Sequence, residues 1–296
     1  MKTHPICKIN LGLRVLRRRP DNYHDLATIF LPLPLCDELE ILPLSPEEEA
    51  HQSVIFSQTG ILVDCLPEDN ICVKAYNLLK KDFPDMPAVK MHLEKVIPFG
   101  AGLGGGSSDA AFTLKMLNEL FALGLDNLQL KDYAARLGAD CAFFIDCQPA
   151  YATGIGNILT PLPSNPLKGC TLVLVKPNES VSTREAYAGL RLSVQEPERY
   201  EGPIEESPLI QATAQPIETW RDTIVNDFER TIFPIHPAIW ELKELFYQNG
   251  ATYACMSGSG AALFALYRSE EELPQELLDN LSNNHIFTAK FQLIEN

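Results

Sequence analysis

The glycine-rich stretch from Gly100 to Gly106 constrains the fold of this 296-residue chain more than any other feature. It holds five glycines in seven residues. Before it, Val89, Met91 and Leu93 alternate with polar residues, which predicts a half-buried strand. After it, apolar residues recur at the spacing of a helix, which we expect to end at Gly124. These apolar positions are Ala110, Ala111, Leu114, Leu117 and Phe121.

A glycine turn between a strand and a helix is a local device for holding an anion. Glycine permits positive φ angles and close approach of the backbone to a ligand. Successive N–H groups in such a turn form an anion-binding concavity, and the helix adds its unpaired N–H groups and positive dipole end. Ser107 and Ser108 add hydroxyls for capping the helix or for contacting phosphate and Mg²⁺. The stretch therefore predicts a phosphate-binding loop.

Three alternatives to this interpretation can be compared. Gly100, Gly102 and Gly105 satisfy the dinucleotide-binding pattern G-x-G-x-x-G, but the preceding strand alternates, whereas a Rossmann strand is buried on both faces. The acid about 20 residues later, Asp126, follows the end of a helix and does not end a second strand. A Walker A loop is excluded because no lysine follows the glycines. A plain flexible turn rarely uses five glycines and then continues directly into an amphipathic helix.

Composition restricts the classes of partner. The hydrophobic fraction of 46% and the charged fraction of 21% are typical of a soluble globular protein. A formal net charge of −15 argues against nucleic acid and anionic membranes as partners. The N-terminus shows no apolar signal segment, so we expect a cytoplasmic protein. The eight cysteines form no C-x-x-C pair, which favours buried reduced thiols over a zinc site or a disulfide framework. We predict no protein metal cluster, and the sequence leaves the oligomeric state open.

The order of the predicted elements indicates an α+β protein. Residues 7–15 alternate strictly and predict a half-buried strand whose polar face carries Lys8 and Asn10, about 6–7 Å apart. Strands and helices alternate without long apolar runs, and a proline-rich stretch follows residue 156. We therefore expect an N-terminal domain of residues 1–156 and a C-terminal domain of residues 157–296. The remaining expected strands lie near 37–42, 54–56, 171–175, 262–267 and 287–293, and the helices near 70–81, 128–137, before 250 and 270–281.

The loop from Pro98 to Ser108 resembles the phosphate-binding loop of the GHMP kinases, the superfamily of galactokinase, homoserine, mevalonate and phosphomevalonate kinases. Four further stretches narrow this resemblance: residues 7–11, 22–26, 137–140 and 255–261. In order and spacing they are similar to the branch that phosphorylates a cytidine diphosphate ester of methylerythritol on the non-mevalonate route to isoprenoids. One departure is Asn22, where this branch usually has glycine. Asparagine tolerates the left-handed conformation, so we expect the turn to be retained.

The resemblance implies a two-domain GHMP kinase fold of the α+β class, with the active site in the cleft between domains. It implies that Lys8 and Asp140 are catalytic, that ATP and Mg²⁺ are used, and that the substrate is a small cytidine diphosphate ester. The ATP-binding positions implied are Asn70, Pro98, Phe99, Gly100, Ala101, Gly102, Leu103, Gly104, Gly105, Gly106, Ser107 and Ser108. The substrate-binding positions implied are Asn10, Tyr23, His24, Thr183 and Tyr187.

Several of these residues also have ordinary structural interpretations. A lysine on the polar face of a strand is usually a solvated charge, and an acid before an apolar run, such as Asp140, is often a helix N-cap. Asn70 resembles the residue on the adenine side of the ATP site and is equally an N-cap. Tyr187 fits either a base-stacking ring or a helix-packing one. Residues 257–259 form a second glycine loop, which we expect to face the phosphates.

Three hypotheses about function remain from the sequence. The first is a kinase for the cytidine diphosphate ester, the second a GHMP kinase for another alcohol, such as a mevalonate or sugar derivative, and the third a non-enzymatic nucleotide sensor. The segment from Asn22 to His24 favours the first. Lys8 and Asp140 are both present, which counts against the third.

Overall fold

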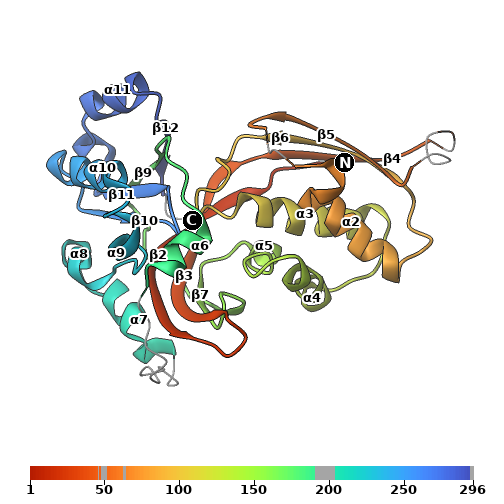
Figure 1. Cartoon of the computed structure of the whole chain (residues 1–296), viewed down its shortest axis with the longest axis horizontal. Coiled ribbons are helices and arrows are strands. Elements are labelled where there is room, and N and C mark those ends of the chain that lie inside the picture. Colours follow the sequence, from red (N-terminus) through yellow and green to blue (C-terminus); the bar gives the residue numbers. More distant parts are fainter. Residues whose placement is uncertain (46, 48–51, 63–64, 191–203, 294–296) are drawn as a thin grey trace. The chain divides into compact units, whose positions relative to one another are not determined.

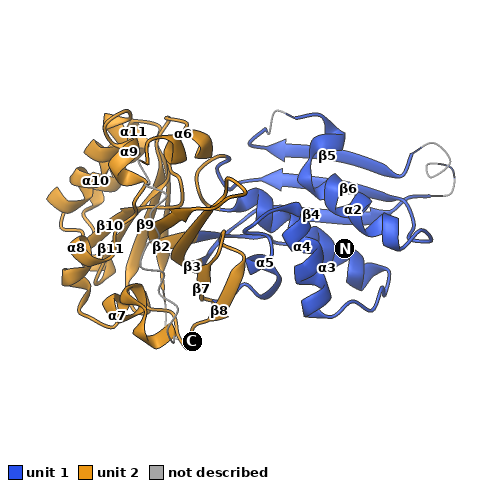
Figure 2. Ribbon diagram, turned by 60° about the horizontal axis from the view of Figure 1, so that its bottom comes forward, with its two compact units in different colours: residues 1–8, 32–99, 104–148 blue, residues 9–31, 100–103, 149–296 orange. Residues whose placement is uncertain are grey.

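The computed structural model describes residues 1–45, 47, 52–62, 65–190 and 204–293 (Figure 1). The chain forms two compact units (Figure 2). Unit 1 comprises residues 1–8, 32–99 and 104–148, and unit 2 comprises residues 9–31, 100–103 and 149–296. The expected division into residues 1–156 and 157–296 is a single cut along the sequence. The compact units are assembled from interleaved segments and do not correspond to such a cut, so the domain boundary stays a prediction.

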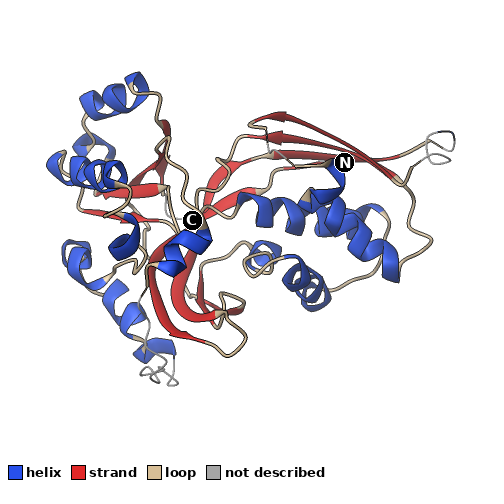
Figure 3. Ribbon diagram, in the orientation of Figure 1, coloured by secondary structure: helices blue, strands red, loops and turns tan. Residues whose placement is uncertain are grey.

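Unit 1 combines a four-stranded sheet with a layer of helices. The strand order is β1-β4-β6-β5, with β5 and β6 parallel and the other pairs antiparallel. Figure 3 shows the helices of this unit gathered on one side of its strands. The strands are β1 (Lys2–Thr3), β4 (Glu38–Pro43), β5 (Val54–Gly60) and β6 (Val89–Lys95). The helices are α2 (Ile71–Asp82), α3 (Gly105–Leu120), α4 (Asn127–Leu137) and α5 (Phe143–Asp146), with the 3₁₀ turn η1 (Pro67–Asp69).

Unit 2 contains most of two further sheets, of order β2-β3-β7-β8 and β10-β11-β9-β12; residues 6–8 of β2 and 32–36 of β3 belong to unit 1. Helices α10 and α11 pack on the second of these sheets and help to enclose its core. The strands are β2 (Ile6–Arg18), β3 (His24–Cys36), β7 (Ala150–Thr153), β8 (Ile158–Pro161), β9 (Thr171–Lys176), β10 (Tyr253–Met256), β11 (Leu263–Tyr267) and β12 (Phe287–Gln292). The helices are α6 (Thr183–Ala188), α7 (Pro208–Thr213), α8 (Trp220–Thr223), α9 (Glu229–Ile232), α10 (Pro237–Gln248) and α11 (Gln275–Asn283). The 3₁₀ turns are η2 (Ile204–Glu206), η3 (Ile217–Thr219) and η4 (Glu270–Glu272).

The first long strand, β2, is buried more deeply than its alternating sequence predicts. Residues 7–13 are buried on both faces, including the polar Lys8 and Asn10. The prediction of a half-buried strand was wrong for this stretch, although the strand itself is confirmed. Strand β3 was not predicted at all. Pro32 and Pro34 interrupt its apolar run, and in the strand both prolines lie on the less buried side.

Two helices of unit 1 begin at side-chain caps, of which the sequence predicted the one at Asn70. Asn70 caps α2 by accepting a hydrogen bond from the Cys72 N–H, and Asp126 with Gln129 forms a capping box at the start of α4. The acidic helix expected near 270–281 begins later, at Gln275, after η4. Among the described helices, we find none with the length and apolar character of a membrane span. Four cysteines are buried, namely Cys7, Cys72, Cys141 and Cys255, whereas Cys65 is exposed.

Candidate active site

The residues predicted to be catalytic form an ion pair within unit 1. Lys8 lies on β2 with only 3% of its surface exposed, and its Nζ is 3.3 Å from Oδ2 of Asp140. The Asp140 side chain is about one-third exposed, at 32%. The expectation of a solvated lysine is therefore wrong. Asp140 is also not the cap of the helix that follows, because α5 has Ala142 at its N-cap position. A buried ammonium facing an accessible carboxylate can polarise a hydroxyl group.

The first turn of α3 begins beside this lysine. Gly104 is the N-cap of α3, with φ of +69°. A Cβ at Gly104 would lie 2.9 Å from Cζ of Phe144 and 3.2 Å from Cε of Lys8, so a larger residue has no room there. The opening N–H groups of a helix have no partner within the helix. The structure thus places an anion-binding helix terminus next to the Lys8–Asp140 pair.

A buried charge cluster, which the sequence analysis did not single out, packs against the N-terminus of α3. Lys95 Nζ donates to Asp109 Oδ2 at 2.7 Å and also to Asp37, and all three side chains are almost fully buried. Burial raises the pKa of Asp109; Lys95 opposes that effect, and Asp37 adds to it. Lys95 Nζ would lie 3.0 Å from a Cβ at Gly105, so the cluster reaches the first turn of α3.

The glycines at the start of the loop belong to unit 2, where they meet the second glycine loop. Ser257 Oγ donates to the Gly102 carbonyl at 2.9 Å and accepts from the Asn10 N–H at 3.2 Å. The backbone approach is so close that a Cβ at Gly258 would lie 3.1 Å from Cα of Gly102. Residues 100–103 and 257–259, which are far apart in the sequence, therefore form one hydrogen-bonded structure. We call residues 257–259 the serine loop.

The residues expected to bind the substrate base also lie together in unit 2. The ring of His24 stacks on that of Tyr187, with centroids 4.4 Å apart and an angle of 18° between the planes. Tyr187 makes an edge contact with the buried Phe228 at 4.8 Å. One turn earlier on α6, the Thr183 hydroxyl lies 3.2 Å from that of Ser259. Sequence reasoning missed Phe228, because its polar neighbours Asp227 and Glu229 give no sign that it packs against Tyr187.

The hairpin turn before His24 is held by charges. Asn22 adopts φ of +68°, which confirms that asparagine replaces glycine in this turn. The Asp25 carboxylate accepts hydrogen bonds from Arg17 and from Arg19. Burial and then the nearby Arg18 lower the pKa of His24 from 6.5, so its ring is neutral at pH 7. Tyr23 is 60% exposed and makes no ring stack among the described residues.

Two of the predicted binding residues have structural partners. Asn10 donates from Nδ2 to the Thr28 hydroxyl at 3.0 Å. Asn70 is buried at the N-cap of α2, where its Oδ1 accepts from the Cys72 N–H at 2.9 Å. The capping interpretation of Asn70 is thus confirmed, and its role toward adenine stays a prediction. Among the remaining loop positions, Pro98, Ala101 and Leu103 are buried, whereas Phe99 is exposed.

The first turn of α3 presents a buried polar group that suits a nucleotide phosphate. No cluster of three or more metal-binding side chains occurs within the described ranges. The hydroxyl of Ser108, by contrast, is fully buried in the first turn of α3 and has no hydrogen-bond partner among the described residues. A buried hydroxyl at a helix N-terminus suits a phosphate oxygen or a cation that arrives with the nucleotide.

Family models and solved structures of known kinases match this chain. The model for the GHMP kinases N terminal domain matches residues 70–148, and the model for the GHMP kinases C terminal domain matches residues 211–285. The crystal structure of a mevalonate kinase superposes with a TM-score of 0.70 at 13% identity over 98% of each chain, which shows a shared fold. The fold and the glycine loop thus define the GHMP class of kinases.

Closer relatives narrow the class. A 4-diphosphocytidyl-2-C-methyl-D-erythritol kinase from Bacteroides thetaiotaomicron is 49% identical over 93% of this chain and 95% of its own. One from Nitratidesulfovibrio vulgaris is 36% identical over 90% of both chains. The crystal structure of a 4-(cytidine 5'-diphospho)-2C-methyl-D-erythritol kinase superposes with a TM-score of 0.76 at 30% identity over 98% of both chains. The chain belongs to the family of 4-diphosphocytidyl-2-C-methyl-D-erythritol kinases.

Proposed function

We propose that this protein transfers the γ-phosphoryl group of ATP to the 2-hydroxyl of 4-diphosphocytidyl-2-C-methyl-D-erythritol, a step in isoprenoid synthesis by the non-mevalonate route. The observation that carries the proposal is the Lys8–Asp140 pair, 3.3 Å apart, beside the N-terminus of α3. This combination supplies a proton acceptor, a fixed positive charge and a phosphate-binding helix end. Phosphoryl transfer needs mainly positioning and charge stabilisation, which these groups provide.

Each residue of the pair has a distinct role in the proposed reaction. Asp140 accepts or orients the proton of the substrate hydroxyl, and its partial exposure leaves it accessible to a ligand. Lys8 is buried with its charge directed at Asp140, so it favours the ionised hydroxyl and stabilises negative charge that develops during transfer. The N–H groups at the start of α3 bind phosphate oxygens. Mg²⁺ accompanying ATP would neutralise phosphate charge, with Ser107 and Ser108 as the nearest hydroxyls of the loop.

The stack of His24 and Tyr187 supports a nucleobase as the other end of the substrate. An aromatic face binds any base, so stacking contributes affinity and not selectivity. Selectivity for cytosine needs hydrogen bonds to its edge, which we assign to the backbone and ring of the His24 segment. We place the reaction in the cytoplasm, where ATP and Mg²⁺ are supplied and the free thiols of the chain stay reduced.

The test is the ratio of kcat/KM for the cytidine and uridine diphosphate esters of methylerythritol, measured by coupled ADP release at saturating Mg-ATP. Cytosine and uracil exchange a donor for an acceptor at two edge positions. Because each mismatched buried group costs about 1–3 kcal/mol, we expect the cytidine ester to be favoured by roughly 30-fold to 10⁴-fold. Mevalonate and a sugar alcohol serve as control acceptors. Equal values for the two esters would replace the proposal by a GHMP kinase for another alcohol, and absence of ADP release with every acceptor would favour the nucleotide sensor.

A further inference from the structure

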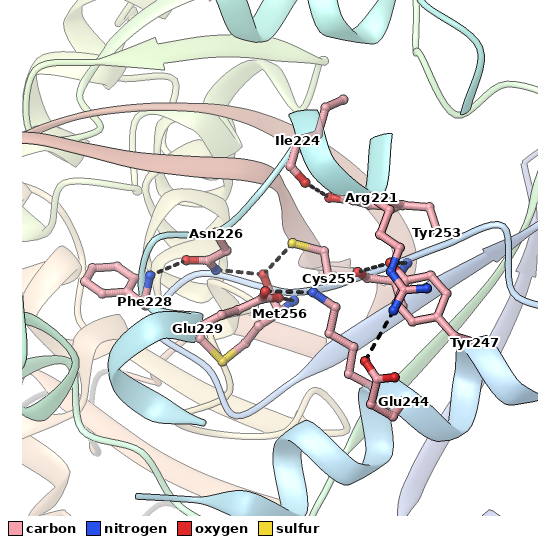
Figure 4. Close-up of polar contacts among 12 residues, drawn as sticks. Arg221, Ile224, Asn226, Phe228, Glu229, Glu244, Tyr247, Tyr253, Cys255 and Met256 are labelled. Atoms are coloured by element: carbon pink, nitrogen blue, oxygen red, sulfur yellow. Dashed lines mark hydrogen bonds and ion pairs between the residues drawn. The ribbon is translucent and has the colours of Figure 1, made fainter. Parts of the chain in front are cut away.

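The segment from Asn226 to Glu229 leads from α8 into the first residue of α9 and contacts the serine loop. Asn226 is 1% exposed, and its side-chain amide donates to the carbonyls of Met256 and Gly258, both at 2.8 Å. Its Oδ1 accepts from the Phe228 N–H at 3.0 Å, so the amide is held in one orientation (Figure 4). The two carbonyls flank Ser257 in the sequence. Asn226 therefore fixes the backbone on both sides of that serine.

Glu229 adds a second attachment to the same strand end. Its Oε1 accepts from the Met256 N–H at 2.9 Å, and its Oε2 accepts from Lys243 Nζ at 2.7 Å (Figure 4). Burial alone would lower the pKa of Lys243, but the attraction to Glu229 and its neighbours outweighs burial and raises it. Lys243 is therefore charged, and the Glu229 carboxylate that it neutralises can remain buried. Met256 is held through both its N–H and its carbonyl.

The Ser257 hydroxyl, which lies between Met256 and Gly258 in the sequence, continues the hydrogen-bond network to the glycine loop. Ser257 Oγ donates to the Gly102 carbonyl and accepts from the Asn10 N–H. Gly102 has φ of +73°, and a Cβ added there would lie 2.1 Å from the Ser257 carbonyl oxygen, so the two backbones are closely packed. A continuous chain of hydrogen bonds thus runs from Asn226 through the serine loop to Gly102, all within unit 2.

We propose that Asn226 is a positioning residue for ATP binding, which it supports through Ser257 by holding the glycine loop in its binding conformation. This inference rests on the proposed function, because it takes residues 100–108 as the ATP phosphate loop. Asn226 is linked to the His24–Tyr187 stack through Phe228, whose N–H donates to the Asn226 Oδ1, an acceptor that aspartate retains. Replacement of Asn226 by aspartate should therefore weaken ATP binding and leave the binding of the cytidine ester nearly unchanged.

The test replaces Asn226 by aspartate, which keeps the shape of the side chain but removes both donors and directs an oxygen at two carbonyls. Isothermal titration with the non-hydrolysable analogue adenylyl imidodiphosphate, in the presence of Mg²⁺, measures the dissociation constant. We expect it to rise about 10-fold to 100-fold in N226D, as for the loss of two buried hydrogen bonds. The KM of the cytidine ester should change by less than about threefold, since its contacts are not altered. If N226D does not fold, Asn226→Ser is measured instead, because it adds no charge.

Asn118 supplies a matched control, because its side-chain amide also holds a turn, by bonds to the N–H and the carbonyl of Leu125. N118D should lose stability without any change in the analogue's dissociation constant. A double-mutant cycle with Ser257→Ala then tests the route. If Asn226 acts through Ser257, the double variant binds the analogue no more weakly than the weaker-binding single variant.

Equal analogue affinities for N226D and the wild type would overturn the inference, as would additive effects in the cycle or equal effects of N118D and N226D. Failure of the wild type to bind the analogue at all would instead refute the proposed function, so the two failures are distinguishable.

Discussion

Replacing Gly104 by alanine tests whether the start of α3 and the catalytic lysine are spatially coupled. Gly104 has φ of +69°, a region that L-residues occupy at a cost of about 1–2 kcal/mol. The added Cβ would also lie 2.9 Å from Cζ of Phe144 and 3.2 Å from Cε of Lys8. Both neighbours must therefore move by some tenths of an ångström, and one of them carries the charge that the proposed mechanism uses.

Gly124 separates the two effects of this substitution. Its φ of +75° is nearly the same, but a Cβ there would meet no atom within 4 Å. G124A should therefore show the backbone strain alone, a loss of about 1–2 kcal/mol in unfolding free energy with unchanged kcat. G104A should show a similar strain together with a loss of about tenfold in kcat, scaled from the roughly 10²-fold that a 1 Å misplacement costs. The longer, branched side chain in G104V should abolish ATP binding while the fold is retained.

The assay pairs urea denaturation of the G104A and G124A variants with ADP-release kinetics on the cytidine ester. An unchanged kcat in G104A would refute the spatial argument, because it would mean that Lys8 can move without consequence. A loss of kcat in G124A equal to that in G104A would refute it in another way, by showing that backbone strain anywhere in α3 and its flanks is sufficient. ATP titration of folded G104V completes the set, and unchanged affinity there would remove the glycine loop from the ATP site.

Further predictions follow from the other charged groups. Asp140→Asn should lower kcat by about 10²–10⁴-fold with little change in KM if the carboxylate is a general base. The exposed control D222N should be fully active. More than a tenth of the activity left in D140N would exclude the role of general base. Lys95→Met leaves two buried carboxylates without their cation and should cost about 3–5 kcal/mol of unfolding free energy, less at low pH where one of them is protonated; a urea midpoint equal to that of the wild type would contradict this. For Asp25, burial raises the pKa, but two arginines outweigh burial and lower it from 3.8. Its stabilising contribution is therefore complete above pH 3.8 and is lost as the pH falls through the lower value of the folded state, so D25N should flatten the acid limb of the stability curve.

The parts of the fold that the sequence predicts are those with a clear period or a local cap. Strand β6 alternates as expected, and α2 begins directly after the predicted cap at Asn70. Strand β3 was missed because Pro32 and Pro34 break its pattern; both lie beyond residues 28–30, where β3 pairs with β7. The burial of β2 on both faces could not be predicted, because it depends on elements that are distant in the sequence. An alternating pattern shows that one face of a strand is buried, but it does not show whether other elements cover the opposite face.

The residues of the candidate site can likewise be separated into those that the sequence predicts and those that it does not. The glycine loop was predictable from its residues, but the capping role offered for Ser107 and Ser108 was wrong, because α3 already begins at Gly105 with Gly104 as its N-cap. The pairing of Lys8 with Asp140 came from resemblance to a family, since 132 positions separate the two and no local pattern links them. The supporting groups were not predicted: the register of Lys95 with Val89, Met91 and Leu93 was overlooked, and Asn226 looked like an ordinary loop residue. The role of Asn226 exists only through tertiary contacts, which a single sequence does not encode in any local signal.

The interleaving of the two units limits how the gene can be divided or recombined. A fragment that starts at Pro149 would contain β7 and β8 but lack residues 9–31, which supply most of β2 and β3 in the same sheet. Such a fragment would expose an unpaired strand edge and would be prone to aggregate. Chimeras between two relatives should therefore fold only if residues 9–31 and 149–161 come from the same parent. These two stretches therefore have to fold together, even though more than a hundred codons lie between them.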